Sequence, residues 1–235
     1  MSKIQSGSLE YEKVIEYVYQ KILSGELVIG SKLPTERALA EELGIGRSSA
    51  REALCILSGM GIVERIQGSG NYITKNASKS VTQIVAMTLA LGRITEENII
   101  EFRRVLERSL CIVIIEKGLT QEQIDEFEFI LKKLRDAEVK DRLMWDKKFH
   151  DLLVKASGNQ LFITITEAIT YSYVKSMKNA IETSDNNDIK ELIDSHDEIF
   201  ESIRDKDYLR AVESVDKHFD IVEKVFHKEA ENYGK

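Results

Sequence analysis

The sequence LPTERALAEELGIGRSSAREALCIL, residues 33–57, contains two short apolar series at helical spacing. The first series comprises Ala38, Leu39, Ala40 and Leu43. It begins just after Pro34, the only proline, whose fixed φ and missing N–H suit a first helical turn, and it ends at Gly44, which suits a left-handed C-cap. After residues 44–46 the second series comprises Ala50, Ala53, Leu54 and Leu57. Two helices joined by a tight turn predict a helix-turn-helix motif.

Polar side chains gather at the start of the second predicted helix, where they are Arg47, Ser48, Ser49 and Arg51. Arginine reads guanine edges in the major groove of DNA, and serine can bond phosphate or base. Residues 61–66 and 71–74 read as two strands joined by the glycine-containing turn 67–70, which would form a wing. The alternative is a small helical subdomain with an ordinary hairpin, because an arginine at a helix start is often only solvated.

Three motifs in this region resemble the GntR family of bacterial transcription regulators. The pattern G-x-x-L-P-[ST]-E-R-x-L-A stands at 30–40, R-x-x-x-R-E-A-L at 47–54, and G-[LI]-[VI]-x-x-x-x-G-x-G at 61–70. The resemblance implies DNA contacts by Arg37, Arg47, Ser48, Ser49, Arg51 and Gly68. Gly46 stands where the family usually has Ser or Thr, and Gln67 and Ser69 stand where Pro and Arg are common. These departures leave the operator sequence open.

Charge is distributed unevenly along the 235 residues, whose net charge is −7. Residues 1–77 carry nine Lys or Arg and nine Asp or Glu, so the acidic excess belongs to the rest of the chain. Affinity for DNA should therefore rest on a local arginine cluster and on two copies binding together. We expect a homodimer on palindromic double-stranded DNA.

The two cysteines, Cys55 and Cys111, lie in helical apolar patterns and favour buried free thiols rather than a disulfide framework or a zinc knuckle. The sequence has no apolar region of signal-peptide length at its start and no run of 18 apolar residues. A cytoplasmic location with no membrane contact is expected.

A mainly α protein with two domains is predicted. Residues 1–76 would form the winged helix-turn-helix domain, including a helix over 11–23, and the polar residues 77–80 would form a linker. Residues 81–235 would form an all-α antiparallel bundle of about seven helices, with Thr95 and Thr120 as N-caps. The helices are expected at 81–91, 95–117, 121–138, 141–157, 159–183, 188–205 and 207–232.

Four polar residues fall on apolar faces of the predicted bundle: Asp146, His150, His196 and His218. A single buried histidine is more often a satisfied core residue than a ligand. An unpaired buried carboxylate, however, costs several kcal/mol or takes up a proton. A metal ion resolves all four groups at once, and three imidazoles with one carboxylate suit one Zn²⁺, Ni²⁺ or another divalent first-row ion per chain. His227, the remaining histidine, falls outside this set and is expected at the surface.

The C-terminal part also resembles the FadR subfamily and its ligand-binding domain, called FCD. The pattern R-x-x-L-E stands at 103–107, D-x-x-F-H at 146–150 and A-x-G-N at 156–159. The resemblance implies that Asp146, His150, His196 and His218 are the metal ligands and that Arg103 lies near a bound effector. Because all four ligands are present, it favours the metal-dependent branch, which senses small carboxylates.

Arg103 has two alternative partners, because it lies on an apolar helix face where a lone guanidinium would be costly. An i, i+4 ion pair with Glu107 and an effector carboxylate carry similar weight, and both can hold together. Further candidates for the effector pocket are Asn159, Tyr171, Ser172, Tyr173 and Lys175.

A transcription regulator, expected to be a repressor, is therefore the predicted function, with operator binding controlled by a small organic acid at the metal site. One alternative is the same regulator with a purely structural metal. A second is a metal-dependent hydrolase, which is disfavoured because no general base stands at a fixed spacing from the ligands. The protein is expected not to be an enzyme.

Overall fold

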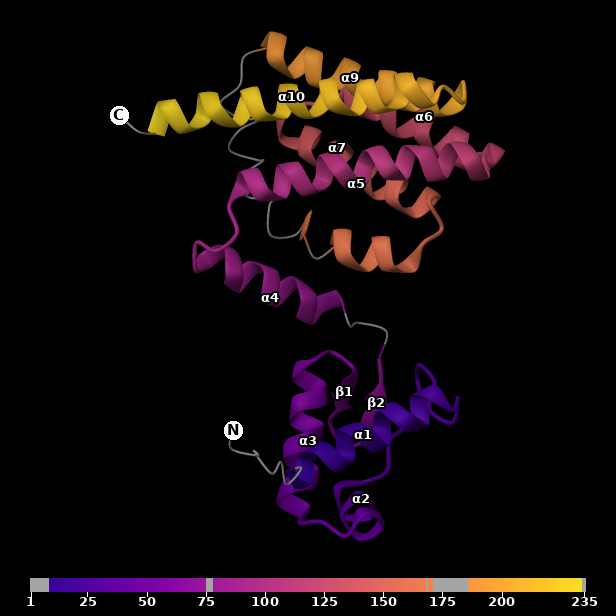
Figure 1. The fold of residues 1–235 in the computed structure, drawn as a ribbon, viewed down its shortest axis with the longest axis vertical. Coiled ribbons are helices and arrows are strands. Elements are labelled where there is room, and N and C mark those ends of the chain that lie inside the picture. The colour runs from indigo at the N-terminus through magenta and orange to yellow at the C-terminus, as the bar shows by residue number, and fades with distance from the viewer. Residues whose placement is uncertain (1–8, 75–77, 168, 171–185, 234–235) are drawn as a thin grey trace, which may run out of the picture. The chain divides into compact units, whose positions relative to one another are not determined.

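The computed structural model describes residues 9–74, 78–167, 169–170 and 186–233. It divides into two compact units, residues 1–83 and 84–235 (Figure 1). None of the described helices is both long enough and apolar enough to cross a bilayer. The two units are described separately below.

The N-terminal unit consists of three helices and a hairpin. The helices are α1 (Glu10–Leu23), α2 (Glu36–Leu43) and α3 (Arg47–Gly59), and the strands are β1 (Val63–Ile66) and β2 (Gly70–Ile73). The strands pair antiparallel from Val63 with Ile73 to Ile66 with Gly70. Side chains from all three helices and both strands form one core, which includes Val14, Leu39, Leu54, Val63 and Ile73. The predicted winged helix-turn-helix is confirmed.

Local chemistry explains the turn between α2 and α3. Gly44 has φ 63° and ψ 42°, the left-handed conformation that glycine adopts without a Cβ clash. At the other end of α2, the hydroxyl of Thr35 accepts a hydrogen bond from the N–H of Ala38 and is the N-cap. The prediction that Pro34 lies in the first turn is wrong: Thr35 supplies the N-cap, so Pro34 lies just before the helix.

The C-terminal unit has one apolar core, formed by α5 (Glu96–Lys117), α6 (Gln121–Asp136), α7 (Val139–Ala156), α9 (Asn186–Arg204) and α10 (Tyr208–Tyr233). Residues 160–167 and 169–170 are also helical, and α4 (Ser78–Ala90) spans the division between the two units. Each of the seven predicted helices overlaps one of these segments; the part of the fifth beyond residue 170 lies outside the described residues. Residues 78–80, expected in the linker, form the first turn of α4.

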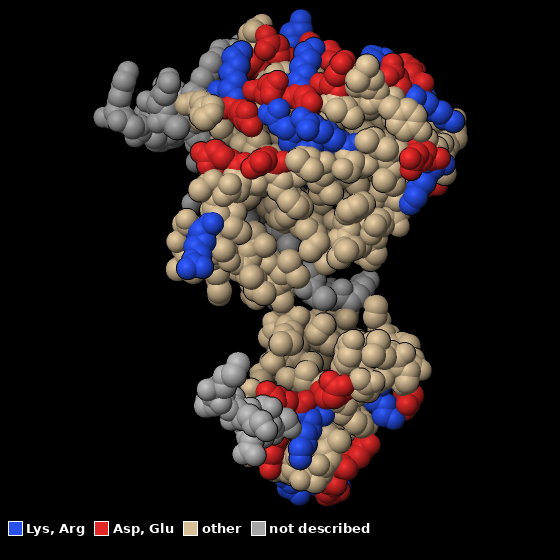
Figure 2. Space-filling view, in the orientation of Figure 1, with Lys and Arg blue, Asp and Glu red and all other residues tan. Residues whose placement is uncertain are grey.

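Helix α10 packs against α9 and α5, and α7 packs against α5 and α6 (Figure 1). In the core, the ring centroid of Phe127 lies 5.6 Å from that of Phe149 and 5.2 Å from that of Phe200. On the outer face of α9 and α10, basic and acidic side chains alternate without forming a patch of one sign (Figure 2). Ion pairs such as Lys217 with Glu198 join the two helices there.

Candidate functional site

The start of α3 presents the polar side chains that the sequence assigns to DNA. Arg47, Ser48 and Arg51 are exposed and line a groove of about 620 Å³. Cys55 lies in the same groove, so the prediction that both cysteines are buried is wrong for Cys55 and right for Cys111. Cys55 is exposed because it lies outside the face of α3 that is buried through Ala53, Leu54 and Leu57.

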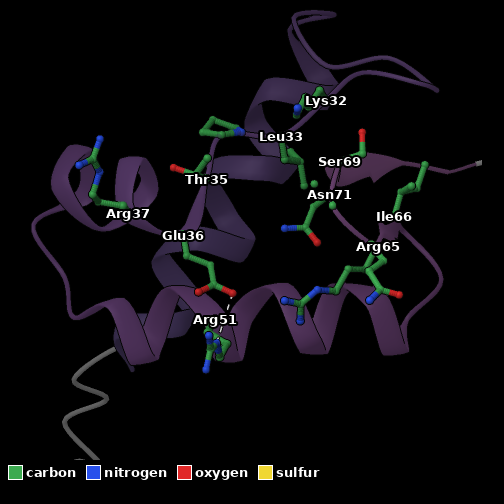
Figure 3. Close-up of a pocket in the computed structure, with 14 residues that line it drawn as sticks. Lys32, Leu33, Thr35, Glu36, Arg37, Arg51, Arg65, Ile66, Ser69 and Asn71 are labelled. Atoms are coloured by element: carbon green, nitrogen blue, oxygen red, sulfur yellow. Dashed lines mark hydrogen bonds and ion pairs between the residues drawn. The ribbon is translucent and has the colours of Figure 1, made fainter.

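A second cleft, of about 780 Å³, lies between the wing and the start of α2 (Figure 3). It contains the predicted residues Arg37, Arg51 and Gly68. It also contains Lys32 and Arg65, which the sequence analysis did not select. Lys32 belongs to the cleft because it pairs with Tyr72 as an isolated antiparallel bridge, which places it alongside the wing. The cleft therefore adds two cations to the candidate DNA-binding surface.

Two of the candidate DNA-binding arginines pair with carboxylates. Arg51 Nε lies 3.3 Å from Glu36 Oε1, and Arg37 Nε lies 3.8 Å from Glu41 Oε1. Both arginines are exposed, and exposed ion pairs of this kind contribute about 0 to 1 kcal/mol. DNA phosphates can therefore replace these partners at low cost.

Glu10 of α1 holds the first turn of α3. Its Oε2 accepts hydrogen bonds from the N–H of Gly46, at 3.1 Å, and from the hydroxyl of Ser49, at 2.7 Å. Gly46 is the N-cap of α3 and has no side chain with which to cap it, so a carboxylate from another helix takes that role. The hydroxyl of Ser49, a predicted DNA contact, is directed to Glu10. The hydrogen bonds from Ser49 and Gly46 lower the pKa of the Glu10 carboxyl below its usual value.

Glu10→Gln is expected to lower the melting temperature near pH 7, because the amide lacks the negative charge opposite the helix N-terminus. The folded pKa of Glu10 is depressed, so its contribution to stability is present above about pH 4.5 and is lost as the pH falls further. The difference between Glu10→Gln and the parent should thus shrink in melts from pH 7 to pH 3. Glu16→Gln is the control, because Glu16 bonds Gln20 within α1. A difference that stayed constant with pH would contradict this role.

In the C-terminal unit, three histidines from three helices converge. His150 of α7, His196 of α9 and His218 of α10 each offer one ring nitrogen, and these three nitrogens lie within 4.8 Å of one another. Their exposed fractions are 5%, 1% and 1%. His227 is exposed, as expected. The predicted inward orientation of the three histidines is confirmed.

The second ring nitrogen of each histidine has a partner that fixes its tautomer. His150 Nδ1 donates to Glu107 Oε2 at 2.9 Å, and His196 Nδ1 donates to the carbonyl of Leu192 at 2.7 Å, because these oxygens can only accept. The Ser195 hydroxyl donates to the same carbonyl, so its oxygen accepts from His218 Nδ1 at 2.9 Å. Each ring therefore carries a hydrogen on Nδ1, so Nε2 is the atom that can bind a metal ion when the ring is neutral.

Asp146 faces two of these Nε2 atoms. Its Oδ1 lies 3.1 Å from His196 Nε2 and 3.8 Å from His150 Nε2, and within the described part of the chain none of these three atoms has a hydrogen-bond partner. Burial alone would raise the pKa of the Asp146 carboxyl, but His196, His150 and Arg103 outweigh burial and hold the pKa at about 2. Burial lowers the pKa of His218 well below its usual value, and the nearby His196 and His150 add to this effect. An ionised carboxylate and neutral imidazoles are the ligand forms that bind a metal ion.

Glu107 and Arg103 of α5 adjoin this cluster. Arg103 Nη2 donates to Glu107 Oε1 at 3.0 Å, and both side chains are buried, at 4% and 3% exposure. The i, i+4 ion pair considered from the sequence is therefore present. The bond from His150 to Glu107 and the role of Ser195 were not predicted, because they join residues 43 and 23 positions apart. Of the other pocket candidates, Tyr171, Ser172, Tyr173 and Lys175 lie outside the described residues, and Asn159 caps the turn that leads to Leu161.

Comparison with known proteins agrees with this two-part organisation. The family model for bacterial regulatory proteins of the gntR family matches residues 10–73, and that for the FCD domain matches residues 86–221. The chain is 28% identical to the HTH-type transcriptional regulator LutR of Bacillus subtilis, over 77% of this chain and 85% of that protein. It is 24% identical to the Exu regulon transcriptional regulator of Escherichia coli K12, over 84% and 76% of the two chains.

A solved structure with the same organisation is Streptococcus agalactiae GntR. It has a TM-score of 0.69 and 28% sequence identity, with 91% of this chain and 99% of that chain covered. The two named relatives are transcriptional regulators, so the comparisons favour a regulator over the hydrolase alternative. The chain belongs to the GntR family of DNA-binding transcription regulators and carries an FCD domain.

Proposed function

We propose that this regulator is a homodimeric repressor that binds a palindromic operator in the cytoplasm. One recognition helix per chain and an N-terminal unit with balanced charge support the need for two copies. Arg47, Ser48 and Arg51 would enter the major groove. Arg37, Lys32 and Arg65 would contact phosphates, and Gly68 would approach the backbone at the wing. Ser49 would act through its bond to Glu10.

The C-terminal domain would hold one divalent transition metal ion, zinc or nickel, through Asp146, His150, His196 and His218. The observation that carries this proposal is the convergence of three buried ring nitrogens, within 4.8 Å of one another, beside Asp146. Its Oδ1 lies 3.1 Å from His196 Nε2, and neither atom has a hydrogen-bond partner among the described residues. A buried polar atom without a hydrogen-bond partner is costly, and a metal ion would satisfy both atoms at once. Such an ion supplies Lewis acidity and open coordination positions that a carboxylate oxygen can occupy.

The effector would be a small organic acid. A 2+ ion, Asp146 and the Arg103 with Glu107 pair together leave a net charge of +1, which an anion complements. Effector binding would change operator affinity only if the acid binds better to one arrangement of the dimer than to another. The high burial of the ligands favours the alternative of a purely structural metal, so the test must measure a response and not only binding.

The variant Arg103→Lys tests the effector site. Alanine is unsuitable, because it would remove the positive charge that pairs with the buried Glu107 carboxylate, at a cost of about 3 to 5 kcal/mol. Lysine keeps the charge but lacks the planar fork of donors, so Arg103→Lys should retain metal and operator binding. It should need about ten- to a hundredfold more acid to release DNA, because a hydrogen bond to a charged group contributes roughly 1.5 to 3 kcal/mol.

The measurement is operator release, titrated with mono-, di- and hydroxycarboxylates of low molecular mass. Arg104→Lys is the matched control, because Arg104 is the next residue on α5 and pairs with Asp220 and Glu223 of α10 instead. If no acid released operator DNA or tightened its binding, the metal would be structural. An equal midpoint for Arg103→Lys and the parent would place the effector elsewhere.

A further inference from the structure

We propose that Glu107 is a positioning residue that couples the charge at Arg103 to the metal-binding strength of His150. This inference rests on the proposed metal site and deepens it. The carboxylate of Glu107 accepts from Arg103 Nη2 with Oε1, at 3.0 Å, and from His150 Nδ1 with Oε2, at 2.9 Å. One buried group therefore joins the proposed effector-binding residue of α5 to a proposed metal ligand of α7.

The three histidines differ in the acceptor that each Nδ1–H meets. His196 donates to a backbone carbonyl and His218 donates to a hydroxyl, whereas His150 donates to a carboxylate. A charged acceptor makes a stronger hydrogen bond and withdraws the ring hydrogen further, which raises the electron density at the opposite nitrogen. His150 is therefore the ligand whose donor strength depends most on a neighbouring charge.

The charge of Glu107 is in turn shared with Arg103. The two oxygens of one buried carboxylate face the guanidinium of Arg103 and the imidazole of His150, at 3.0 and 2.9 Å. An anion that binds the guanidinium of Arg103 offsets part of its positive charge. The carboxylate of Glu107 then interacts more strongly with the Nδ1–H of His150. His150 then becomes a stronger ligand. Because linkage is reciprocal, the acid raises metal affinity by the same factor by which the metal raises acid affinity.

The relay can be tested without knowing the acid, because Arg103→Gln imitates the withdrawal of positive charge from Glu107. The experiment is a double-mutant cycle with Arg103→Gln, Glu107→Gln and the double variant, in which zinc affinity is measured by competition with a chromophoric chelator. Glu107→Gln should weaken zinc binding about ten- to a hundredfold, the usual effect of losing a hydrogen-bond partner of a metal ligand. Arg103→Gln should strengthen zinc binding in the parent and do so much less when position 107 is glutamine.

Asp151→Asn is the matched control, because it removes one carboxylate from an i, i+4 ion pair with Lys147 on α7, away from the histidine cluster. It should leave zinc affinity unchanged. An Arg103→Gln effect of equal size in both backgrounds would mean that charge acts only through space, and the relay would be rejected. A parent protein that binds no zinc would instead overturn the proposed metal site itself.

A second measurement covers the case in which the glutamine variants do not fold. In the zinc-loaded parent with ¹⁵N-labelled histidines, the His150 Nδ1–H proton should resonate furthest downfield of the three, because it alone meets a carboxylate. The milder variant Arg103→Lys should move this resonance and leave those of His196 and His218 in place. Equal shifts of all three, or none, would reject the relay.

Discussion

Arg51→Ala is expected to abolish specific operator binding. Arg51 is exposed near the start of α3 and lines both clefts of the candidate DNA-binding surface. A good bidentate contact between arginine and guanine is worth about 1 to 3 kcal/mol, and a symmetric dimer loses it twice. The expected loss of affinity is therefore about thirty- to twenty-thousandfold. Fluorescence anisotropy at fixed salt, on an operator enriched from random DNA, measures it.

Arg65→Ala provides the contrast. Arg65 lies on the wing side of the cleft, where a phosphate contact is expected (Figure 3). Its loss should weaken binding to all sequences and reduce the salt dependence by about one unit of slope per protomer, while selectivity is kept. Parent-like affinity of both Arg51→Ala and Arg47→Ala would show that α3 is not the recognition helix.

The double variant His196→Ala/His218→Ala is expected to lose its metal ion and to melt at a much lower temperature than the parent. A ligand present at about a thousand times its dissociation constant stabilises the folded state by about 4 kcal/mol. In a chain of this size, that corresponds to about 8 to 16 °C in melting temperature. Removing the two imidazoles also leaves cavities around Asp146, which adds to the loss.

Elemental analysis and thermal melts with and without a chelator measure this effect. His227→Ala is the control, because it removes the one histidine that is exposed and outside the cluster. It should keep both the metal and the melting temperature. Purified parent protein that contained no transition metal, and that gained no stability from added zinc or nickel, would contradict the metal proposal.

Local signals located most of the helix ends from the sequence. Thr95 and Thr120 cap their helices as predicted, each in a reciprocal arrangement with the side chain three residues later. Helix α4 was placed three residues too late, because Ser78 and Ser80 resemble linker residues although the hydroxyl of Ser80 instead bonds the carbonyl of Gly59. A polar side chain at a helix start has contacts in space that its neighbours in sequence do not reveal.

Periodicity found the inward faces of His150, His196 and His218, because burial on a helix repeats every three to four residues. Periodicity did not predict the hydrogen-bond partner of each imidazole. Glu107 was predicted only as the i, i+4 partner of Arg103. Its second oxygen accepts a hydrogen bond from His150 of α7, a helix that begins 32 residues later. Lys32 and Glu10 were missed for the same reason, since their roles depend on β2 and α3, which lie far away in sequence.

The burial of the three imidazoles also determines how fast a bound metal ion can exchange with ions in solution. The three imidazoles are only 1 to 5% exposed and come from three helices, so they would have to move apart before an ion held by all of them could leave. Exchange would have to wait for helices α7, α9 and α10 to separate locally, an opening whose free energy approaches that of the packed core. The ion found after purification would then record which metal was present while the chain folded, and not the rank order of affinities. Refolding in the presence of competing ions, rather than dialysis of the folded protein, would reveal the intrinsic preference.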